Sequence, residues 1–323
     1  TLVVRCPDWP LTALGVGPLQ PALVLASGRV VATTPAAREA GVARGQRLRE
    51  AQFRCPEVRV MERDDSREAR RFEVVAAALE DVTPWLEAWR PGSCAFGVRG
   101  PVRLSGGEVN LVGRTARLVV AALDDLVGSS AGHPGCGIGV ADGRFAAGLA
   151  AGAADASVVD GGGAVVVPPG GVPAFLAPLP VAVLGRPALV DVLVRLGLDT
   201  LGAFAALPAA DVVARFGAEG RDAHRLASGM DGRPPDPRPV PPDLEVSVAF
   251  DPPVERVDQV AFAARSLSEA LHGRLSDRGL ACTLVLIEAE TEHGERLARR
   301  WRDEGVLGPG AVADRVRWQL EGW

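Results

Sequence analysis

The fold is decided by the stretch Gly28–Pro56, which reads GRVVATTPAAREAGVARGQRLREAQFRCP. Its β-branched start predicts the second strand of a hairpin whose turn is Ser27-Gly28, and Gly41 and Pro56 each stop a helix. The expected elements are two strands and two short helices, over Ala22–Leu25, Val30–Ala32, Pro35–Ala40 and Gln46–Phe53. This part of the chain is therefore predicted to be a small sheet with helices packed on it.

Outward from this stretch, strands and helices alternate. The segment Thr1–Cys6 is β-branched and closed by Pro7, so it is expected to be a strand. Apolar residues at three- and four-residue spacing predict a long helix over Asp65–Trp85, with Asp64 or Asp65 as its cap. Further strands are expected at Cys94–Val98, Val102–Leu104 and Gly137–Val140, with helices at Val112–Val127 and Arg144–Ala151. This order is that of a ferredoxin-like split βαβ sheet, with a helical insertion after the first strand.

The second half of the chain divides at a proline-rich segment. Before it, the glycine-rich Asp160–Gly171 is interpreted as a connector, because no GK[ST] follows that would make it a phosphate-binding loop. Helices are expected at Ala182–Leu196, Leu201–Leu207 and Ala209–Phe216, with one more ending near Met230. Residues 232–243 hold six prolines and are predicted to be a stiff linker. The last unit is expected to alternate, with strands Leu244–Phe250, Cys282–Ala289 and Arg296–Asp303 and helices Gln259–Arg278 and Gly310 onward.

Composition narrows the class of protein. A chain of 323 residues exceeds one ordinary domain, and 47% hydrophobic with 23% charged residues indicates a globular protein. No apolar run reaches the roughly 18–20 residues of a membrane span, so a cytoplasmic protein is expected. Five scattered cysteines without a CxxC pair predict reduced thiols and no zinc site. The net charge of −5, with arginine as the only cation besides histidine, argues mildly against a dedicated DNA binder.

Four segments, in this order along the chain, resemble the Y-family of translesion DNA polymerases. They are the Gly28–Pro56 stretch, Gly139-Val140-Ala141-Asp142-Gly143-Arg144-Phe145, Leu196-Gly197-Leu198-Asp199-Thr200-Leu201-Gly202, and Phe250-Asp251-Pro252-Pro253. The resemblance covers essentially the whole chain and implies a multi-domain α/β (α+β) right hand. Its expected parts are a palm (1–10 and 63–155), fingers (11–62), a helical thumb (156–231), the linker (232–243) and a little finger (244–323).

Within that family the chain resembles the ImuB sub-family. The features that carry this resemblance are Cys6-Pro7-Asp8-Trp9-Pro10, Phe175–Pro180, and Arg300–Gly305 with Arg315–Leu320. It implies a role in bacterial damage-induced (SOS) mutagenesis beside three protein partners: an ImuA-type accessory protein, a C-family error-prone polymerase and the sliding clamp. The clamp motif is expected in a tail beyond Trp323.

The resemblance assigns the metal ligands of an active polymerase to positions without a carboxylate. The Asp at the end of the first strand falls on Cys6. The adjacent Asp-Glu pair falls on Ser93-Cys94, or on Gly92-Ser93 if the spacing from Glu87 is kept, and no acidic residue occurs between Glu87 and Glu108. Two-metal nucleotidyl transfer needs oxygen ligands for hard cations, whereas a thiol suits soft metals. No metal and no cofactor are therefore expected.

The family's nucleotide-binding residues are mostly replaced as well. By the same resemblance, the aromatic steric gate falls on Pro10-Leu11 and the palm lysine on Gly148. Of the Tyr and Arg that hold the triphosphate, only Arg38 remains, and Pro35 stands in place of the Tyr. Asp8 matches the family's next acidic position and is the one carboxylate that could substitute as a metal ligand.

The sequence thus favours a non-catalytic adaptor in error-prone translesion synthesis. Two alternatives stay open: a low-efficiency active polymerase that uses Asp8, and a protein-only scaffold without DNA affinity. The candidate contacts to primer–template or single-stranded DNA are the arginines of one strand, Arg296, Arg299, Arg300 and Arg302. Alternate strand residues share a face, so three of them are expected to project together. The competing interpretation is a solvated face neutralised by Glu292, Glu295, Asp303 and Glu304.

Overall fold

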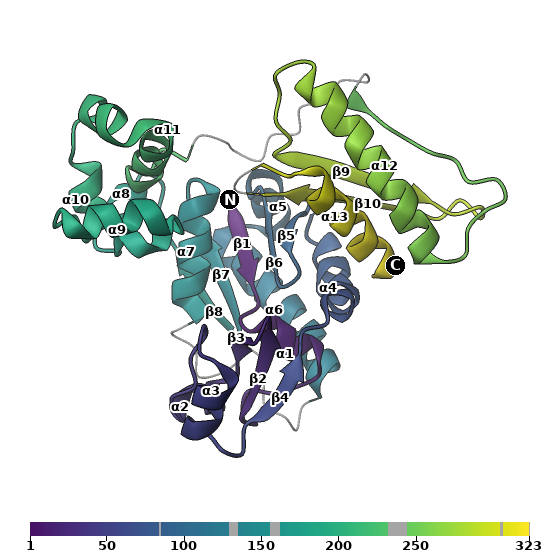
Figure 1. Cartoon of the computed structure of the whole chain (residues 1–323), viewed down its shortest axis with the longest axis horizontal. Coiled ribbons are helices and arrows are strands. Elements are labelled where there is room, and N and C mark those ends of the chain that lie inside the picture. Colours follow the sequence, from purple (N-terminus) through teal and green to yellow (C-terminus); the bar gives the residue numbers. More distant parts are fainter. Residues whose placement is uncertain (84, 129–134, 156–161, 232–243, 304–305, 323) are drawn as a thin grey trace. The chain divides into compact units, whose positions relative to one another are not determined.

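The protein is described by a computed structural model over residues 1–83, 85–128, 135–155, 162–231, 244–303 and 306–322 (Figure 1). Contacts group the chain into two units. The first holds Thr1–Arg5, Ala95–Val112 and Cys136–Asp236, and the second holds Cys6–Cys94, Gly113–Gly135 and Pro237–Trp323. These units do not test the predicted palm, fingers, thumb and little-finger boundaries, and the predicted linker 232–243 lies outside the described residues.

The first unit is built on a strand–helix–strand arrangement. Strand β1 (Leu2–Arg5) pairs antiparallel with β7 (Cys136–Val140), and β7 pairs parallel with β8 (Gly162–Val166). Helix α7 (Arg144–Asp155) packs on these three strands. It does so through small residues, since Ala146, Ala147, Ala150 and Ala151 are all buried. Close approach of helix and sheet follows from this choice of side chains.

Strand β8 corrects the prediction of a connector over Asp160–Gly171. The glycines of this segment do not prevent a strand, because parallel pairing with β7 satisfies its backbone from Gly162 to Val166. A crossover helix between parallel strands, here α7, is the ordinary way to place such a strand. The prediction of a connector rested on the many glycines of this segment, and the segment alone does not show that it pairs with β7.

The later helices of the first unit agree with the predictions in part. They are α8 (Val172–Leu176), the 3-10 helix η2 (Val181–Leu184), α9 (Pro187–Arg195), α10 (Leu201–Ala205) and α11 (Ala209–Ala227). Helix α8 was not predicted, and the helix expected over Ala182–Leu196 is divided into η2 and α9. Gly217 interrupts α11 with a positive φ of 63°, so the two helices expected on either side of it are present. The unit is closed by Asp231, whose carboxylate accepts hydrogen bonds from the Arg144 and Phe145 backbone N–H groups at the start of α7.

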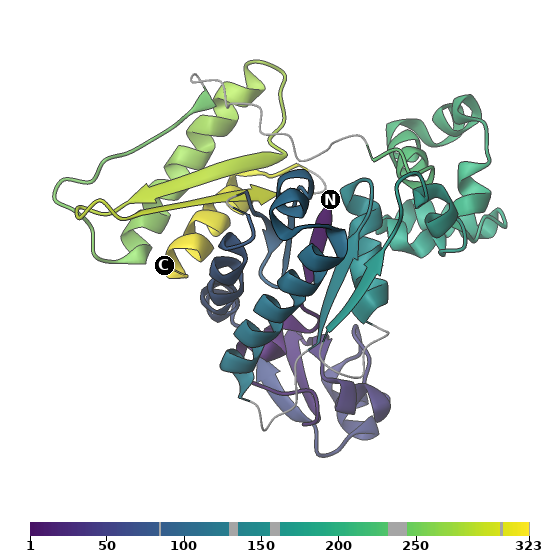
Figure 2. The ribbon, with the colours of Figure 1, turned by 180° about the vertical axis from the view of Figure 1, so that it is seen from behind.

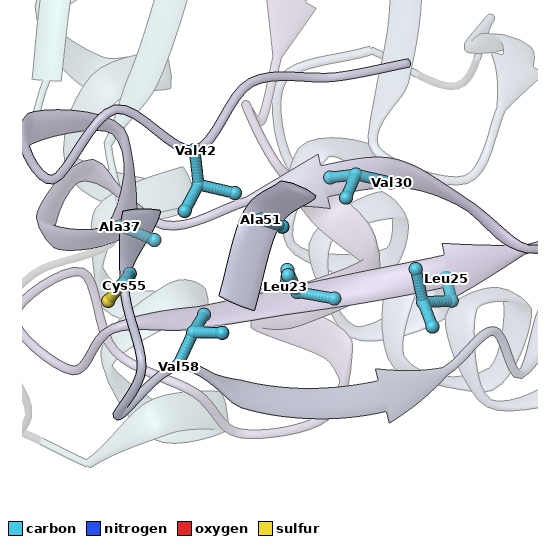
Figure 3. Packing of buried hydrophobic residues seen from close by; sticks show 8 residues of the cluster. All are labelled: Leu23, Leu25, Val30, Ala37, Val42, Ala51, Cys55 and Val58. Atoms are coloured by element: carbon cyan, nitrogen blue, oxygen red, sulfur yellow. The ribbon is translucent and has the colours of Figure 1, made fainter. Parts of the chain in front are cut away.

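The second unit contains the small sheet that opened the sequence analysis. Its strands lie in the order β3 (Arg29–Thr33), β2 (Ala22–Ala26), β4 (Arg59–Glu62), with α2 (Pro35–Glu39) and α3 (Leu48–Arg54) packed on it. The predicted hairpin and both short helices are confirmed. Figure 3 shows their common core, formed by Leu23, Leu25, Val30, Ala37, Val42, Ala51, Cys55 and Val58. Thr34 caps α2 by accepting a hydrogen bond from the Ala37 N–H.

Helix α4 (Asp65–Glu80) and strands β5 (Glu87–Arg90) and β6 (Ser93–Phe96) follow in the chain. Asp64 caps α4 as predicted, but the helix ends at Glu80 and not near Trp85. The helix cannot continue to Trp85, because Pro84 disfavours helical geometry in Thr83, the residue before it. Helix α1 (Trp9–Ala13) packs against α4, where the indole of Trp9 donates to the Glu68 carbonyl over 2.9 Å.

The expected strand Val102–Leu104 is wrong. That segment belongs to helix α5 (Arg99–Ser105), which is followed along the chain by α6 (Glu108–Val127). Pro101 lies in the first turn of α5, where a missing N–H costs nothing, and Gly106 ends the helix with a φ of 72°. The sequence-based predictions also lacked strands β4 and β5, the second of which lies directly before the turn Pro91-Gly92.

The last 80 residues, 244–323, contain α12 (Val257–Ser276), β9 (Leu284–Glu290), β10 (Arg296–Arg302) and α13 (Pro309–Glu321). Figure 1 shows α12 in front of the β9–β10 hairpin, and Figure 2 shows the opposite face of the hairpin. The strand predicted at Leu244–Phe250 is absent from the described structure. Leu244 and Val246 instead pack against a core of Leu271, Leu275, Cys282, Leu307 and Val312, which accounts for the alternation without strand pairing. Among the described residues, every helix is too short or too polar to traverse a lipid bilayer.

Candidate functional site

The positions that the sequence analysis assigned to metal ligands lie together in the second unit. The backbone N–H of Cys6 donates to the Gly92 carbonyl over 2.8 Å, which places the end of the first strand beside the turn that leads into Ser93 and Cys94. All three of these side chains are buried, and Cys94 is fully so. Gly92 is required here, because its φ is 89° and a Cβ would lie 2.5 Å from the Cβ of Trp9.

The chemistry of these side chains does not suit a hard divalent cation. Burial raises the pKa of the Cys94 thiol to about 12, against an opposing influence of the Arg299 charge, so the thiol stays neutral. Ser93 offers a neutral hydroxyl. Mg²⁺ is held in proteins by carboxylates and other oxygens, and thiols are poor ligands for it. Within the described residues, no group of three or more His, Cys, Asp and Glu side chains is placed to hold a metal ion.

Asp8 is engaged by two arginines. Its side chain is only 10% exposed, and its two carboxylate oxygens face the guanidinium groups of Arg38 and Arg44. Arg44 Nη2 lies 2.7 Å from Asp8 Oδ1, and Arg38 also donates to the Thr33 carbonyl over 2.5 Å. The carboxylate that the sequence offered as a substitute metal ligand therefore neutralises the only retained triphosphate-site arginine.

The local structure explains how these groups meet. Asp8 adopts a left-handed backbone conformation, with φ 49°, directly before α1. Arg38 lies in the last turn of α2, and Arg44 lies in the loop between α2 and α3. That loop is held by Val42, which is buried in the core of Figure 3. Arg44 was missed by the sequence analysis, because its partner lies 36 residues away and no local motif marks the pair.

The two-arginine geometry leads to a prediction for Asp8→Asn, a variant that tolerates the left-handed conformation and removes the charge. Its affinity for inorganic tripolyphosphate, measured by calorimetry without metal, is expected to rise roughly three- to tenfold. The two arginine side chains are about half exposed, so their ion pairs with Asp8 together contribute on the order of 1 kcal/mol. Asp65→Asn, at the exposed Asp65–Arg63 pair, is the matched control. Metal-dependent nucleotide binding that Asp8→Asn abolishes would instead identify Asp8 as a metal ligand.

The remaining positions of the predicted nucleotide site offer little to a nucleotide. Leu11 is 1% exposed in the core beneath the small sheet, and Pro10 lies within α1. Pro35 begins α2. In the first unit, Gly148 lies in the middle of α7 and has no side chain with which to reach a phosphate.

The four arginines of β10 do not form one exposed row. Arg299 and Arg302 are 5% and 7% exposed, whereas Arg296 is exposed and Arg300 is half-buried. The ion pairs that the structure shows for these arginines involve other carboxylates than the predicted Glu292 and Glu295. Asp303 pairs with Arg315, and the predicted Glu304 lies outside the described residues. Arg299 pairs with Glu73 and Glu80, Arg302 with Glu87, and Arg296 with Glu290. The alternation of side chains along the strand correctly predicted which arginines share a face of β10. It could not show that residues of α4 and β5 cover these faces. That these arginines contact DNA stays a prediction.

A family model and several curated proteins match this chain. Residues 14–152 match the model of the impB/mucB/samB (IMS) family. A relative named DNA polymerase IV from Halobacterium salinarum is 33% identical over 259 residues, which are 77% of this chain and 60% of the relative. Another DNA polymerase IV, from Dehalococcoides mccartyi, is 28% identical over 81% of this chain and 64% of its own length. The chain thus spans less than two thirds of the length of these relatives.

Solved structures show the same fold. The crystal structure of DinB from Sulfolobus solfataricus superimposes with a TM-score of 0.58 at 14% identity, over 99% of this chain and 92% of that one. An insertion ternary complex of Dbh DNA polymerase gives a TM-score of 0.60 at 16% identity, with the same coverage. The predicted mixed α/β fold of a Y-family polymerase is confirmed. The chain is homologous to the Y-family DNA polymerases, of the IMS type.

Proposed function

We propose that this chain is a non-catalytic Y-family polymerase-like adaptor of the ImuB type, acting in error-prone translesion DNA synthesis. The proposal rests on the positions that the resemblance assigns to the three metal-binding carboxylates, which are Cys6 and either Ser93-Cys94 or Gly92-Ser93. The observation that carries it is that the side chains of Cys6, Ser93 and Cys94 lie buried together without a carboxylate among them. Asp8, the nearest substitute, is held by Arg38 and Arg44. The Mg²⁺ ions of the family's reaction therefore do not fit this site.

The proposed role is to connect DNA with other proteins. Relatives of this fold have been solved in complexes titled as ternary and post-insertion binary complexes of a DNA polymerase. We infer that this chain likewise engages primer–template or single-stranded DNA. By its resemblance to the ImuB sub-family, its proposed protein partners are an ImuA-type protein, a C-family error-prone polymerase and the sliding clamp. The names of the relatives favour an active polymerase. The ion pairs of Asp8 with Arg38 and Arg44 support an adaptor instead, because they occupy the carboxylate that could have replaced a metal ligand.

Titration of labelled primer–template DNA by fluorescence anisotropy tests this function. The protein is expected to bind DNA more tightly at low than at moderate salt, because arginine–phosphate contacts release counterions. Since no metal-bound nucleotide takes part, Mg²⁺ together with a complementary nucleotide should leave the affinity unchanged. Tightening that requires both would point to an active polymerase, and no binding even at low salt would point to a protein-only scaffold. Addition of the adaptor should also increase lesion bypass by its C-family polymerase partner.

A further inference from the structure

Strand β10 makes a short parallel pairing with β5 of the same unit. Arg300 lies opposite Glu87, and Trp301 lies opposite Ala88. Side chains of a strand alternate between its two faces, so Arg299 and Trp301 project to one face, and Arg300 and Arg302 to the other. Both faces of β10 therefore carry arginines in the part of the strand that pairs with β5.

On the first face, Arg299 is held between two carboxylates of α4. Its guanidinium pairs with both Glu73 and Glu80, which lie two turns apart on one side of the helix. The arginine side chain is 5% exposed, whereas that of Glu80 is half exposed. A buried guanidinium without a partner is costly, so these two carboxylates keep α4 and β10 together.

On the second face, the residues around β5 cover the other arginines. Arg302 Nε lies 3.1 Å from a Glu87 carboxylate oxygen, and both side chains are buried. The Arg300 guanidinium lies over the indole of Trp85, 4.6 Å from its ring centroid, in a cation–π contact. Of the three arginines on this face, Arg296 is the exposed one, and it pairs with Glu290 of the neighbouring strand over 3.0 Å.

The C-terminal segment does not need these contacts for its own packing. Trp301 Nε1 donates to Gln319 over 2.9 Å, and Gln319 donates to the Ile287 carbonyl over 3.0 Å. Both bonds lie within residues 244–323, as does the core around Leu271 and Leu275. The hairpin and helices of this segment thus have a core of their own, in addition to the packing of α13 on α4.

The contact with α4 is also imperfectly satisfied. A cavity of about 10 Å³ lies among Ala69, Phe72, Ala88, Arg299 and Trp318. Arg299 Nε and Trp318 Nε1 are buried and make no hydrogen bond in the described structure. Each such donor costs on the order of 1–3 kcal/mol, which lowers the free energy needed to separate the surfaces.

We propose that the carboxylates of Glu73, Glu80 and Glu87 are an intramolecular substitute for phosphate, an autoinhibitory latch that nucleic acid must displace. Guanidinium groups bind carboxylate and phosphate with the same planar geometry. When β10 leaves α4 and β5, Arg296, Arg300 and Arg302 become one exposed row, and Arg299 becomes accessible on the opposite face of the strand. This inference rests on the proposed engagement of DNA and adds its regulation.

The test is the double variant Glu73→Gln/Glu80→Gln, compared with Glu255→Gln/Glu269→Gln, which removes two exposed carboxylates of the C-terminal segment. The latch variant should bind single-stranded DNA roughly tenfold more tightly than the control variant, with a steeper salt dependence, because each added phosphate contact adds to the slope. Amide hydrogen exchange should quicken in β5 and β10 of the latch variant, and in the wild-type protein when DNA is added. If the double variant does not fold, Trp85→Ala serves as the second test, because it uncovers Arg300 without removing a charge. It should raise the affinity for single-stranded DNA by a smaller factor.

Equal DNA affinity of the latch and control variants would overturn the latch, as would unchanged exchange of β10 in the wild-type protein at saturating DNA. In either case the proposed function stands if the wild-type protein binds DNA. If no variant binds DNA at low salt, both the latch and the DNA-engaging adaptor fail, and the protein-only scaffold remains.

Discussion

The purified protein is expected to extend no primer, on either an undamaged or a lesion-bearing template, with Mg²⁺ or Mn²⁺. In-line transfer of a nucleotide relies on carboxylates that position two cations against the attacking and leaving oxygens. Cys6 and Cys94 are buried thiols at these positions, and the high pKa of Cys94 keeps it uncharged at any working pH. Gel-based extension assays should place the rate on the order of 10⁴-fold or more below that of an active Y-family enzyme, since groups that act as one catalytic unit are lost together.

The assay needs protein concentrations that saturate DNA binding, so that absence of product reports the chemistry and not weak association. An active Y-family polymerase on the same templates serves as the positive control. Templated product that persists in Asp8→Asn would indicate a contaminating polymerase. Product that disappears in Asp8→Asn would show that Asp8 leaves its ion pairs with Arg38 and Arg44 to bind metal, and the adaptor proposal would then be wrong.

Local signals predicted much of the fold. The Ser27-Gly28 hairpin, the helix capped by Asp64 and the break at Gly217 each depend on residues adjacent in the chain, and the structure confirms them. The errors have a different origin. Strand β8 exists because it pairs with β7, and Leu244–Phe250 is no strand because its apolar residues pack on a core instead. Periodicity reports which residues are buried, but not what buries them.

The candidate site shows the same division. The expected replacement of the metal ligands, at Cys6 and at either Ser93-Cys94 or Gly92-Ser93, comes from the family resemblance, because neither register places a carboxylate there. The ion pairs of Asp8 with Arg38 and Arg44 join residues 30 and 36 positions apart, and those of Arg299 join residues more than 200 apart. Such charge pairing has no sequence signal in a chain with 35 arginines, so the most informative electrostatic features came from the structure alone.

Gly139→Ala is expected to destabilise the protein severely. Gly139 lies in β7 beneath α7, where an added Cβ would come 2.0 Å from the Ala147 carbonyl oxygen and 2.3 Å from the Ala151 backbone nitrogen. Neither atom can rotate away, since both belong to the helix backbone. The helix must then move off the sheet and loosen the contacts of its buried alanines.

Overpacking of this kind costs roughly 3 kcal/mol or more when only backbone can yield, which corresponds to a fall in Tm of roughly 10 °C for a chain of this size. Urea and thermal unfolding measure both quantities. The matched control is Gly273→Ala, a glycine inside α12 with open space where the Cβ would be, which should raise stability by about 1 kcal/mol. A Gly139→Ala protein as stable as the wild type would mean that α7 lies farther from β7 than described. The physical role of Gly139 is to let an alanine-lined helix contact the strand backbone, which neither the predicted strand Gly137–Val140 nor the family resemblance indicated.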